Sequence, residues 1–254
     1  TCALLQGGSV SCWGNSNTGI EQLVPAPVAG LSGVTALSSG YGHHCAVLSA
    51  GGVRCWGDNN DGQLGNGSQT DAASPVVVSG IANAVAVAAG SRHSCALLAD
   101  GGVRCWGYRG ISTGFGTVRS GLMGDGGTGV TPALTPVTET GIGTAVAQVT
   151  GSAHTCALLQ DASVWCWGAK GHARGQTDSN DVALAPVQVV VTGAVNALAL
   201  GDDHTCVSLA SGGVQCLGSG FQGQLGTGGQ SNEQNPNPSP YPAFSITPLS
   251  VLFP

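Results

Sequence analysis

HSCALLADGGVRCWG, residues 93–107, is the stretch that decides the fold. It has two short apolar segments on either side of Asp100-Gly101-Gly102, and Asp-Gly and Gly-Gly pairs tolerate the positive φ angles of a tight hairpin turn. Folding back around this turn brings Cys95 opposite Cys105. Directly opposed residues of an antiparallel pair have Cα atoms about 4.5–5.5 Å apart, and a disulfide prefers about 5.5 Å. The stretch therefore predicts a β-hairpin closed by a disulfide.

The same phrase occurs five times and contains every cysteine of the chain, always as a pair ten residues apart. Paired cysteines can instead bind zinc, but zinc sites favour cysteines separated by about two to four residues, and each site would lack half of its ligands. The sequence therefore favours five local disulfides, which persist in the periplasm, at the cell surface or outside the cell. The pairs are Cys2 with Cys12, Cys45 with Cys55, Cys95 with Cys105, Cys156 with Cys166, and Cys206 with Cys216.

Two further strand signals accompany the hairpins. One follows a proline and the other is a Val/Ala run that ends in glycine; examples are residues 75–78, 136–137 and 186–191, and residues 84–90, 145–151 and 194–201. Near-continuous apolar runs are typical of strands buried on both faces, and a radial stack of four-stranded blades provides that environment. The sequence therefore predicts an all-β fold, a β-propeller of four-stranded blades with five repeats visible.

The charge of the chain limits its partners. Seven Lys and Arg residues face thirteen Asp and Glu residues, which gives a formal charge of −6. A protein that binds DNA or RNA through phosphates needs a basic face, so we expect no nucleic-acid partner. No apolar run approaches the roughly 20 residues of a membrane helix, so we expect a soluble chain without membrane insertion.

Residues 93–107, together with DNNDGQLGNG at 58–67 and GQLG at 223–226, resemble the repeat of the regulator of chromosome condensation family. The resemblance covers about residues 1–230 and implies a propeller, which has seven blades in the well-known members of the family. It also implies guanine-nucleotide exchange on a small GTPase as a function. The acidic charge and the ten cysteines make the chain more similar to bacterial secreted, disulfide-rich versions of the repeat.

The domain boundaries follow from the repeats. We expect a repeat propeller over 1–230, a Pro/Asn-rich linker over 231–243, and a last segment over 244–254. This segment either supplies the strand that the first repeat lacks and closes the ring, or begins a truncated domain. The five repeats are either a closed ring or, as we favour, a fragment of a larger propeller. The Gln-Leu-Gly turn of the other repeats is degraded at 19–23 and at 175–177.

Four histidines stand two residues before the first cysteine of a pair: His43, His93, His154 and His204. A ring of metal ligands or bases is one interpretation. Equivalent residues of adjacent blades should lie about 10 Å apart, whereas zinc ligands lie about 2.0–2.3 Å from one ion. We therefore predict structural histidines that bond backbone groups, with no metal and no cofactor. The repeated Trp13, Trp56, Trp106 and Trp167 are predicted to pack between blades.

One loop breaks the regularity. The third repeat is nine residues longer than the second between its tryptophan and its turn, within residues 108–119. Arginine and aromatic residues are enriched at binding hot spots, and loops on rigid scaffolds usually carry binding. The candidate binding residues are Tyr108, Arg109, Phe115, Arg119 and Trp165, the last because it replaces a polar residue of the other repeats. A tolerated surface insertion is the alternative.

These observations predict a non-catalytic, secreted or cell-surface module that binds another protein, with no catalytic residues. A carbohydrate partner, through Trp165 and Tyr108, stays open. Two other functions compete with this prediction: a guanine-nucleotide exchange regulator, by family analogy, and a propeller enzyme such as a lyase or hydrolase. The enzyme is disfavoured because no nucleophile elbow, zincin helix or phosphate loop occurs in the sequence.

Overall fold

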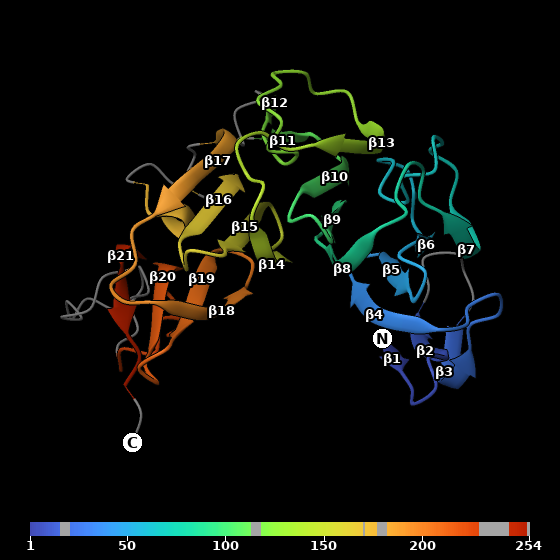
Figure 1. Cartoon of the computed structure of the whole chain (residues 1–254), viewed down its shortest axis with the longest axis horizontal. Coiled ribbons are helices and arrows are strands. Elements are labelled where there is room, and N and C mark those ends of the chain that lie inside the picture. Colours follow the sequence, from blue (N-terminus) through green and yellow to red (C-terminus); the bar gives the residue numbers. More distant parts are fainter. Residues whose placement is uncertain (16–20, 113–117, 170, 177–181, 229–243, 253–254) are drawn as a thin grey trace.

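The computed structural model describes residues 1–15, 21–112, 118–169, 171–176, 182–228 and 244–252. Five antiparallel sheets stand side by side along an open arc, with the first and the last sheet at its two ends (Figure 1). The described residues contain one short helical element, the 3-10 helix η1 (Gly171–Arg174), and no helix long and apolar enough to cross a membrane.

We number the sheets as blades 1 to 5 in chain order. Blade 1 has three strands, β1 (Cys2–Leu4), β2 (Val10–Asn15) and β3 (Glu21–Pro27). Blade 2 has β4 (Val34–Ser39), β5 (His43–Leu48), β6 (Val53–Gly57) and β7 (Ala72–Val77), and blade 3 has β8 (Ala84–Ala89), β9 (His93–Leu98), β10 (Val103–Gly107) and β13 (Ala133–Thr138). Blade 4 has β14 (Ala145–Thr150), β15 (His154–Leu159), β16 (Val164–Gly168) and β17 (Ala183–Val189). Blade 5 has β18 (Val195–Leu200), β19 (His204–Leu209), β20 (Val214–Ser219) and β21 (Phe244–Ser250).

The predicted hairpins and their disulfides are present. The second and third strands of a full blade pair so that the two cysteines are directly opposite each other, as Cys95 is to Cys105. The five Cα–Cα distances are 4.0–4.1 Å, and no free cysteine is present. These distances are slightly shorter than the about 4.5 Å of a closely spaced antiparallel pair, and the pairing register places each disulfide where the sequence predicted it.

The Val/Ala runs form the innermost strands of the fan, and they are β4, β8, β14 and β18. Neighbouring inner strands contact each other, and the proline-led strands lie on the outside of their blades. The prediction of an all-β propeller fold is therefore confirmed. Residues 244–250 form β21, which pairs with β20 as the outer strand of blade 5.

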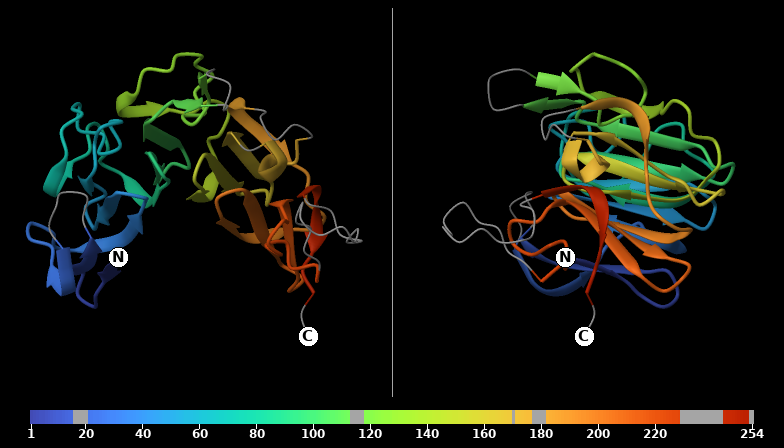
Figure 2. Two further views of the ribbon diagram at one scale, coloured as in Figure 1. Left: turned by 180° about the vertical axis from the view of Figure 1, so that it is seen from behind. Right: turned by 90° about the vertical axis from the view of Figure 1, so that its left-hand side faces the viewer.

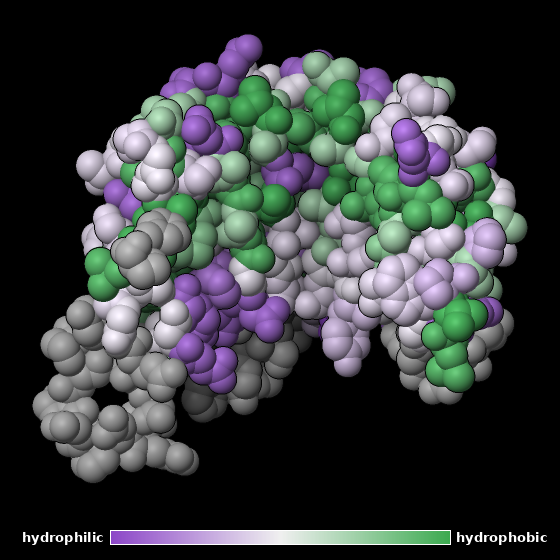
Figure 3. All heavy atoms as spheres, turned by 90° about the horizontal axis from the view of Figure 1, so that it is seen from below, coloured by the Kyte–Doolittle hydropathy of each residue, from purple (hydrophilic) through white to green (hydrophobic). Residues whose placement is uncertain are grey.

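The core lies between the blades. One apolar cluster joins blades 2 and 3 around Leu64 and Trp106, and a second joins blades 3 and 4 around Met123 and Trp167. A third joins blades 4 and 5 around Leu217. Among the described residues, the cluster between blades 1 and 2 has only Val10, Val34, Ala46 and Trp56 fully buried. Seen from the open side of the arc, apolar and hydrophilic surface alternate on both arms (Figure 3).

Candidate binding surface

One edge of the fan carries the long connections. His43 pairs with Gly57, and Gly57 with Ala72, so the β4–β5 loop and the β6–β7 connection meet at the same edge of blade 2. The equivalent strands of blades 3 to 5 have the same register. We call the edge of the blades that carries these connections the turn edge. The insertion of the third repeat forms a two-stranded hairpin here, β11 (Gly110–Ser112) with β12 (Val118–Ser120), which projects from the body of the protein (Figure 2, right).

The β6–β7 connection of blade 2 shows how a complete turn is built. The buried Asn59 side chain accepts a hydrogen bond from the Leu64 amide at 2.9 Å and donates to the carbonyl oxygens of Ser68 and Thr70, both at 3.0 Å. This ordering places Leu64 in the core and directs the Gln63 carbonyl toward blade 3. That carbonyl accepts from Trp106 Nε1 at 2.8 Å. The turn of one blade thus caps the tryptophan of the next.

Three of the four repeated histidines, His43, His93 and His154, bond a hydroxyl group of the next blade, and His204 lies in blade 5, the last blade. The Nε2 atom of His43 lies 2.8 Å from Ser94 Oγ, and Ser94 Oγ in turn donates to the Gln63 carbonyl at 3.0 Å. Because the hydroxyl hydrogen is used in this second bond, His43 Nε2 donates to Ser94. His93 and His154 make the same contact with the hydroxyl groups of Thr155 and Thr205, at 3.0 and 3.1 Å.

These histidines are structural, as expected, but their partner is a side-chain hydroxyl of the neighbouring blade rather than a backbone group. Burial lowers the pKa of His43 to about 3 and that of His93 to about 4, so both rings are neutral at physiological pH. Within the described part of the chain, no group of three or more His, Cys, Asp and Glu side chains could hold a metal ion.

Ion pairs anchor the base of the β11–β12 hairpin. Arg109 binds Asp125 with two contacts, Nη1–Oδ1 at 2.9 Å and Nη2–Oδ2 at 2.6 Å. Burial alone would raise the pKa of Asp125, but the hydrogen bonds from Arg109 and the Gly127 amide, with the guanidinium charge, hold it below its usual value. Arg92 lies over the Tyr108 ring, 4.1 Å from Cζ to the ring centre, and binds Asp61 of the preceding blade at 2.6 Å.

The predicted binding residues therefore separate into groups. Tyr108 and Arg109 lie together at the turn edge, where they hold the hairpin in place. Arg119 is in β12, and Phe115 lies outside the described residues. Trp165 lies toward the opposite end of β16, half-buried, with Nε1 donating to Ser163 Oγ at 3.1 Å. The structure does not bring Trp165 and Tyr108 into one site.

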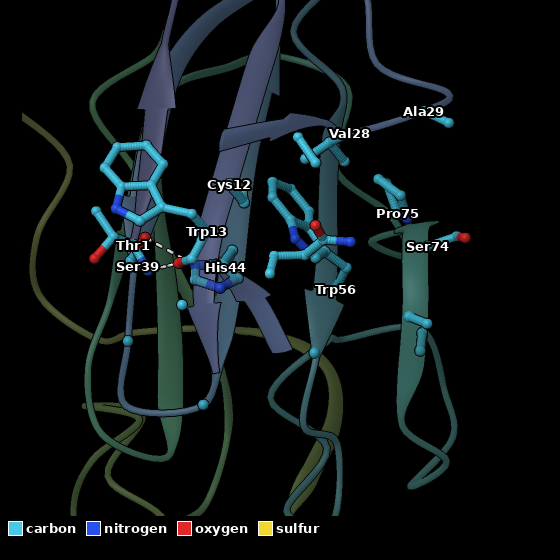
Figure 4. Close-up of a pocket in the computed structure, with 18 of the residues that line it drawn as sticks. Thr1, Cys12, Trp13, Val28, Ala29, Ser39, His44, Trp56, Ser74 and Pro75 are labelled. Atoms are coloured by element: carbon cyan, nitrogen blue, oxygen red, sulfur yellow. Dashed lines mark hydrogen bonds between the residues drawn. The ribbon is translucent and has the colours of Figure 1, made fainter. Parts of the chain in front are cut away.

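A groove between blades 1 and 2 was not foreseen (Figure 4). Its volume is about 550 Å³, and Trp13 and Trp56 border it together with His44 and Tyr41. The prediction that all four repeated tryptophans pack between blades is right for the buried Trp56, Trp106 and Trp167, but Trp13 is half-buried. The sequence signal that could have revealed the groove is the short segment that follows Trp13.

Two models of the "Regulator of chromosome condensation (RCC1) repeat" match the chain, one at residues 50–97 and the other at residues 34–63 and 146–176. The chain is built from RCC1-type repeats. The prediction of this repeat family is confirmed. No curated protein sequence matches the chain.

Solved RCC1-type propellers have the same fold at low sequence identity. Human WBSCR16 is 19% identical with a TM-score of 0.76, over 96% of this chain and 60% of its own. Yeast RCC1 (Prp20), solved with Kap60, is 20% identical with a TM-score of 0.75, over 99% of this chain and 59% of its own. A second structure of Prp20p, from Saccharomyces cerevisiae, is 19% identical with a TM-score of 0.75, over 99% of this chain and 61% of its own. The chain thus spans about 60% of the length of these relatives.

Proposed function

We propose that this RCC1-repeat chain is a non-catalytic, protein-binding module that uses the turn edge of blade 3. The observation that carries the proposal is the anchored β11–β12 hairpin. An insertion that is merely tolerated needs no support, yet this one begins between two bidentate arginine–aspartate pairs, Arg92 with Asp61 and Arg109 with Asp125. Such pairs fix the position of a loop, and a loop that is ordered before binding loses less entropy when a partner docks.

The scaffold supports the same function. The hairpin projects from blades that are each closed by a disulfide, so a rigid scaffold holds its base. Prp20p, which has the same fold, is described with Kap60, Gsp1p and histones. Proteins with this fold can therefore take part in protein binding.

The proposal includes an oxidising location. Five disulfides form and persist in secreted, cell-surface or periplasmic proteins, and cytosolic thiols are kept reduced. We place the module in one of these compartments, where its partner is another secreted or surface protein.

Capture of secreted and envelope proteins on the immobilised, oxidised chain tests the proposal. A variant in which residues 112–118 are replaced by two glycines removes the tip and keeps the Arg109–Asp125 pair. Arg104→Ala, on the far side of blade 3 where Arg104 bonds the Gly80 carbonyl, is the matched control. We expect one protein to be retained by the chain and by Arg104→Ala, and lost from the loop variant. Retention by all three would refute the assigned site, and enrichment of a small GTPase would favour nucleotide exchange instead.

A further inference from the structure

The turn that caps Trp106 contains Asn66-Gly67, the only Asn-Gly pair in the chain. The backbone nitrogen that follows an asparagine can attack the side-chain carbon Cγ, and a following glycine offers the least steric resistance. The new N–Cγ bond closes a succinimide ring, the Cγ–Nδ2 bond breaks, and ammonia leaves with the proton of the attacking amide. Water then opens the ring to aspartate or to isoaspartate, in which the backbone runs through the side chain. The reaction needs no reactant other than water.

The folded turn holds both reacting groups. The Gly67 N–H donates to the Leu134 carbonyl of blade 3 at 2.9 Å, so the nitrogen has to give up a hydrogen bond between blades before it can lose its proton. The Oδ1 atom of Asn66 accepts from the Ser68 amide at 3.1 Å, from the Ser68 hydroxyl at 3.0 Å and from Asn59 Nδ2 at 3.3 Å, which fixes the side chain. Gly67 itself is exposed, so hydrogen bonding rather than exclusion of water protects the pair.

The equivalent turn of blade 3 shows that an aspartate fits this position. Asp125-Gly126 stands there where blade 2 has Asn66-Gly67. The Gly127 amide donates to Asp125 Oδ1 at 3.0 Å, and the Gly126 amide donates to the Leu184 carbonyl of blade 4 at 2.9 Å. These are the two bonds that the blade 2 turn makes with asparagine. Conversion of Asn66 to aspartate should therefore leave the turn in place.

Isoaspartate does not fit in the same way. It lengthens the backbone by one methylene group between Gly65 and Gly67, and both glycines contact blade 3. A Cβ atom at Gly65 would lie 2.7 Å from Trp106 Cδ1, so the chain has no room to bulge toward the indole, and Gly67 is fixed by its bond to Leu134. Isoaspartate also moves the oxygen that accepts the hydrogen bonds of the turn. A chain with isoaspartate at position 66 therefore cannot re-form the cap on Trp106.

We propose that Asn66 is a deamidation site that the closed interface between blades 2 and 3 protects, and that its conversion to isoaspartate makes a separation of these blades permanent. Each local opening that moves the turn away from β13 releases the Gly67 nitrogen to react. Isoaspartate that forms during such an opening prevents the interface from closing again, so the site limits the lifetime of the folded protein. The reaction involves no partner, so the inference goes beyond the function proposed above and does not depend on it.

Peptide mapping by mass spectrometry measures the reaction in the oxidised protein during incubation at pH 8. Deamidation raises the mass of the peptide that contains Asn66 by about 1 Da, and chromatography separates its aspartate and isoaspartate forms. We expect Asn66 in the folded protein to deamidate at least about tenfold more slowly than in the same oxidised chain kept unfolded in urea.

Two matched variants test whether the blade interface is what protects the site. Trp106→Phe leaves the Asn-Gly pair unchanged but removes the donor to the Gln63 carbonyl and part of the ring that packs on the turn. We expect deamidation of Asn66 to become at least about threefold faster in this variant. Trp167→Phe removes the equivalent bond to the Leu122 carbonyl between blades 3 and 4, and it should leave the rate at Asn66 unchanged.

The two products test whether the separation is permanent. The oxidised chain is aged in urea and then refolded by dilution, and exchange of the Trp106 indole N–H is compared between its isoaspartate form and the Asn66→Asp variant. We expect rapid exchange in the isoaspartate form, because its turn cannot cap the indole, and slow exchange in Asn66→Asp, as in the unchanged protein.

Three results would overturn the inference. Equal rates at Asn66 in the folded and unfolded chain, or in Trp106→Phe and Trp167→Phe, would show that the interface between blades 2 and 3 does not protect the site. Slow exchange of the Trp106 indole in the refolded isoaspartate form would show that the blades close again after the reaction.

Discussion

The interface between blades 2 and 3 and the interface between blades 1 and 2 are made by the same repeat, yet only the first is closed. At the closed interface the Gln63 carbonyl accepts from Trp106 and from Ser94, and Leu64 fills the core. At the open interface the equivalent connection is nine residues shorter, five against fourteen, and a groove of about 550 Å³ lies beside Trp56. The difference indicates that the turn completes a blade interface, whereas the strands and disulfides alone do not.

The largest expected contrast is between the two tryptophans. Trp106→Ala should destabilise the protein by about 4 kcal/mol, because it leaves a cavity in a fully packed core and removes a donor from the Gln63 carbonyl. Trp56→Ala should cost about 2 kcal/mol, because Trp56, although only 6% exposed, borders a groove and has fewer packing contacts to lose. Urea unfolding of the oxidised variants measures both. Equal losses would mean that the blade 1–blade 2 interface is as complete as its neighbour.

The glycines at the ends of the inner strands give the next contrast. An added Cβ at Gly90 would lie 2.4 Å from His93 Cε1 and 2.8 Å from the Gly151 carbonyl, so Gly90→Ala should cost about 3 kcal/mol. At Gly143 nothing lies within 4 Å, and Gly143→Ala should be neutral or slightly stabilising. Thermal unfolding distinguishes the two. A small loss of stability in Gly90→Ala would show that the hydrogen bonds from the repeated histidines to the next blade, here called the histidine ladder, do not depend on close contact between the blades.

Glu139 breaks the regularity of blade 3 in another way. It is 3% exposed at the end of the outer strand, where blade 2 has the buried Val78. Burial raises the pKa of Glu139 to about 7, against the opposing effect of the backbone amides of Val103 and Ile142. Between about pH 4.5 and 7 the folded state keeps a proton that the unfolded state has lost, so stability falls as pH rises through this window.

Glu139→Val should remove this pH-dependent loss. The change in unfolding free energy that the substitution causes should be more favourable at pH 8 than at pH 5 by about 2–3 kcal/mol. Unfolding free energies measured at both pH values give the result. The same gain at both values would mean that the carboxyl group titrates normally in the folded protein.

The smallest expected effect concerns the bond between histidine and hydroxyl. Thr155→Val keeps the shape of the side chain but removes the hydroxyl that His93 Nε2 contacts, and should cost about 1–2 kcal/mol. Thr131→Val, at an exposed position, should change stability by less than about 0.5 kcal/mol. If the two variants are equally stable in chemical denaturation, the ladder does not contribute to the cohesion of the blades.

The strands and staples could be predicted from sequence because each depends on neighbours along the chain. Cys95 and Cys105 face each other because the turn at 100–102 fixes the register, and both lie in one hairpin. The partners of Arg109 and His93 could not be predicted in this way. Thr155 lies on the next blade, and only the stacking of repeats brings it to His93. Asp125 lies sixteen residues after Arg109 in the same long connection between β10 and β13, and the irregular path of that connection brings the two together. The groove lies beside the short connection after Trp13, so its sequence signal is the length of a segment and not the identity of any one residue.

Hydrogen exchange of the tryptophan indole N–H groups tests the account of closed and open interfaces most directly. Nuclear magnetic resonance resolves each indole in the oxidised protein without altering any residue. We expect the Nε1 hydrogens of Trp106 and Trp167, which are buried and bonded to turn carbonyls, to exchange at least a hundredfold more slowly than that of Trp56. Protection of Trp56 equal to that of Trp106 would contradict the account, because it would mean that the indole of blade 2 is already capped.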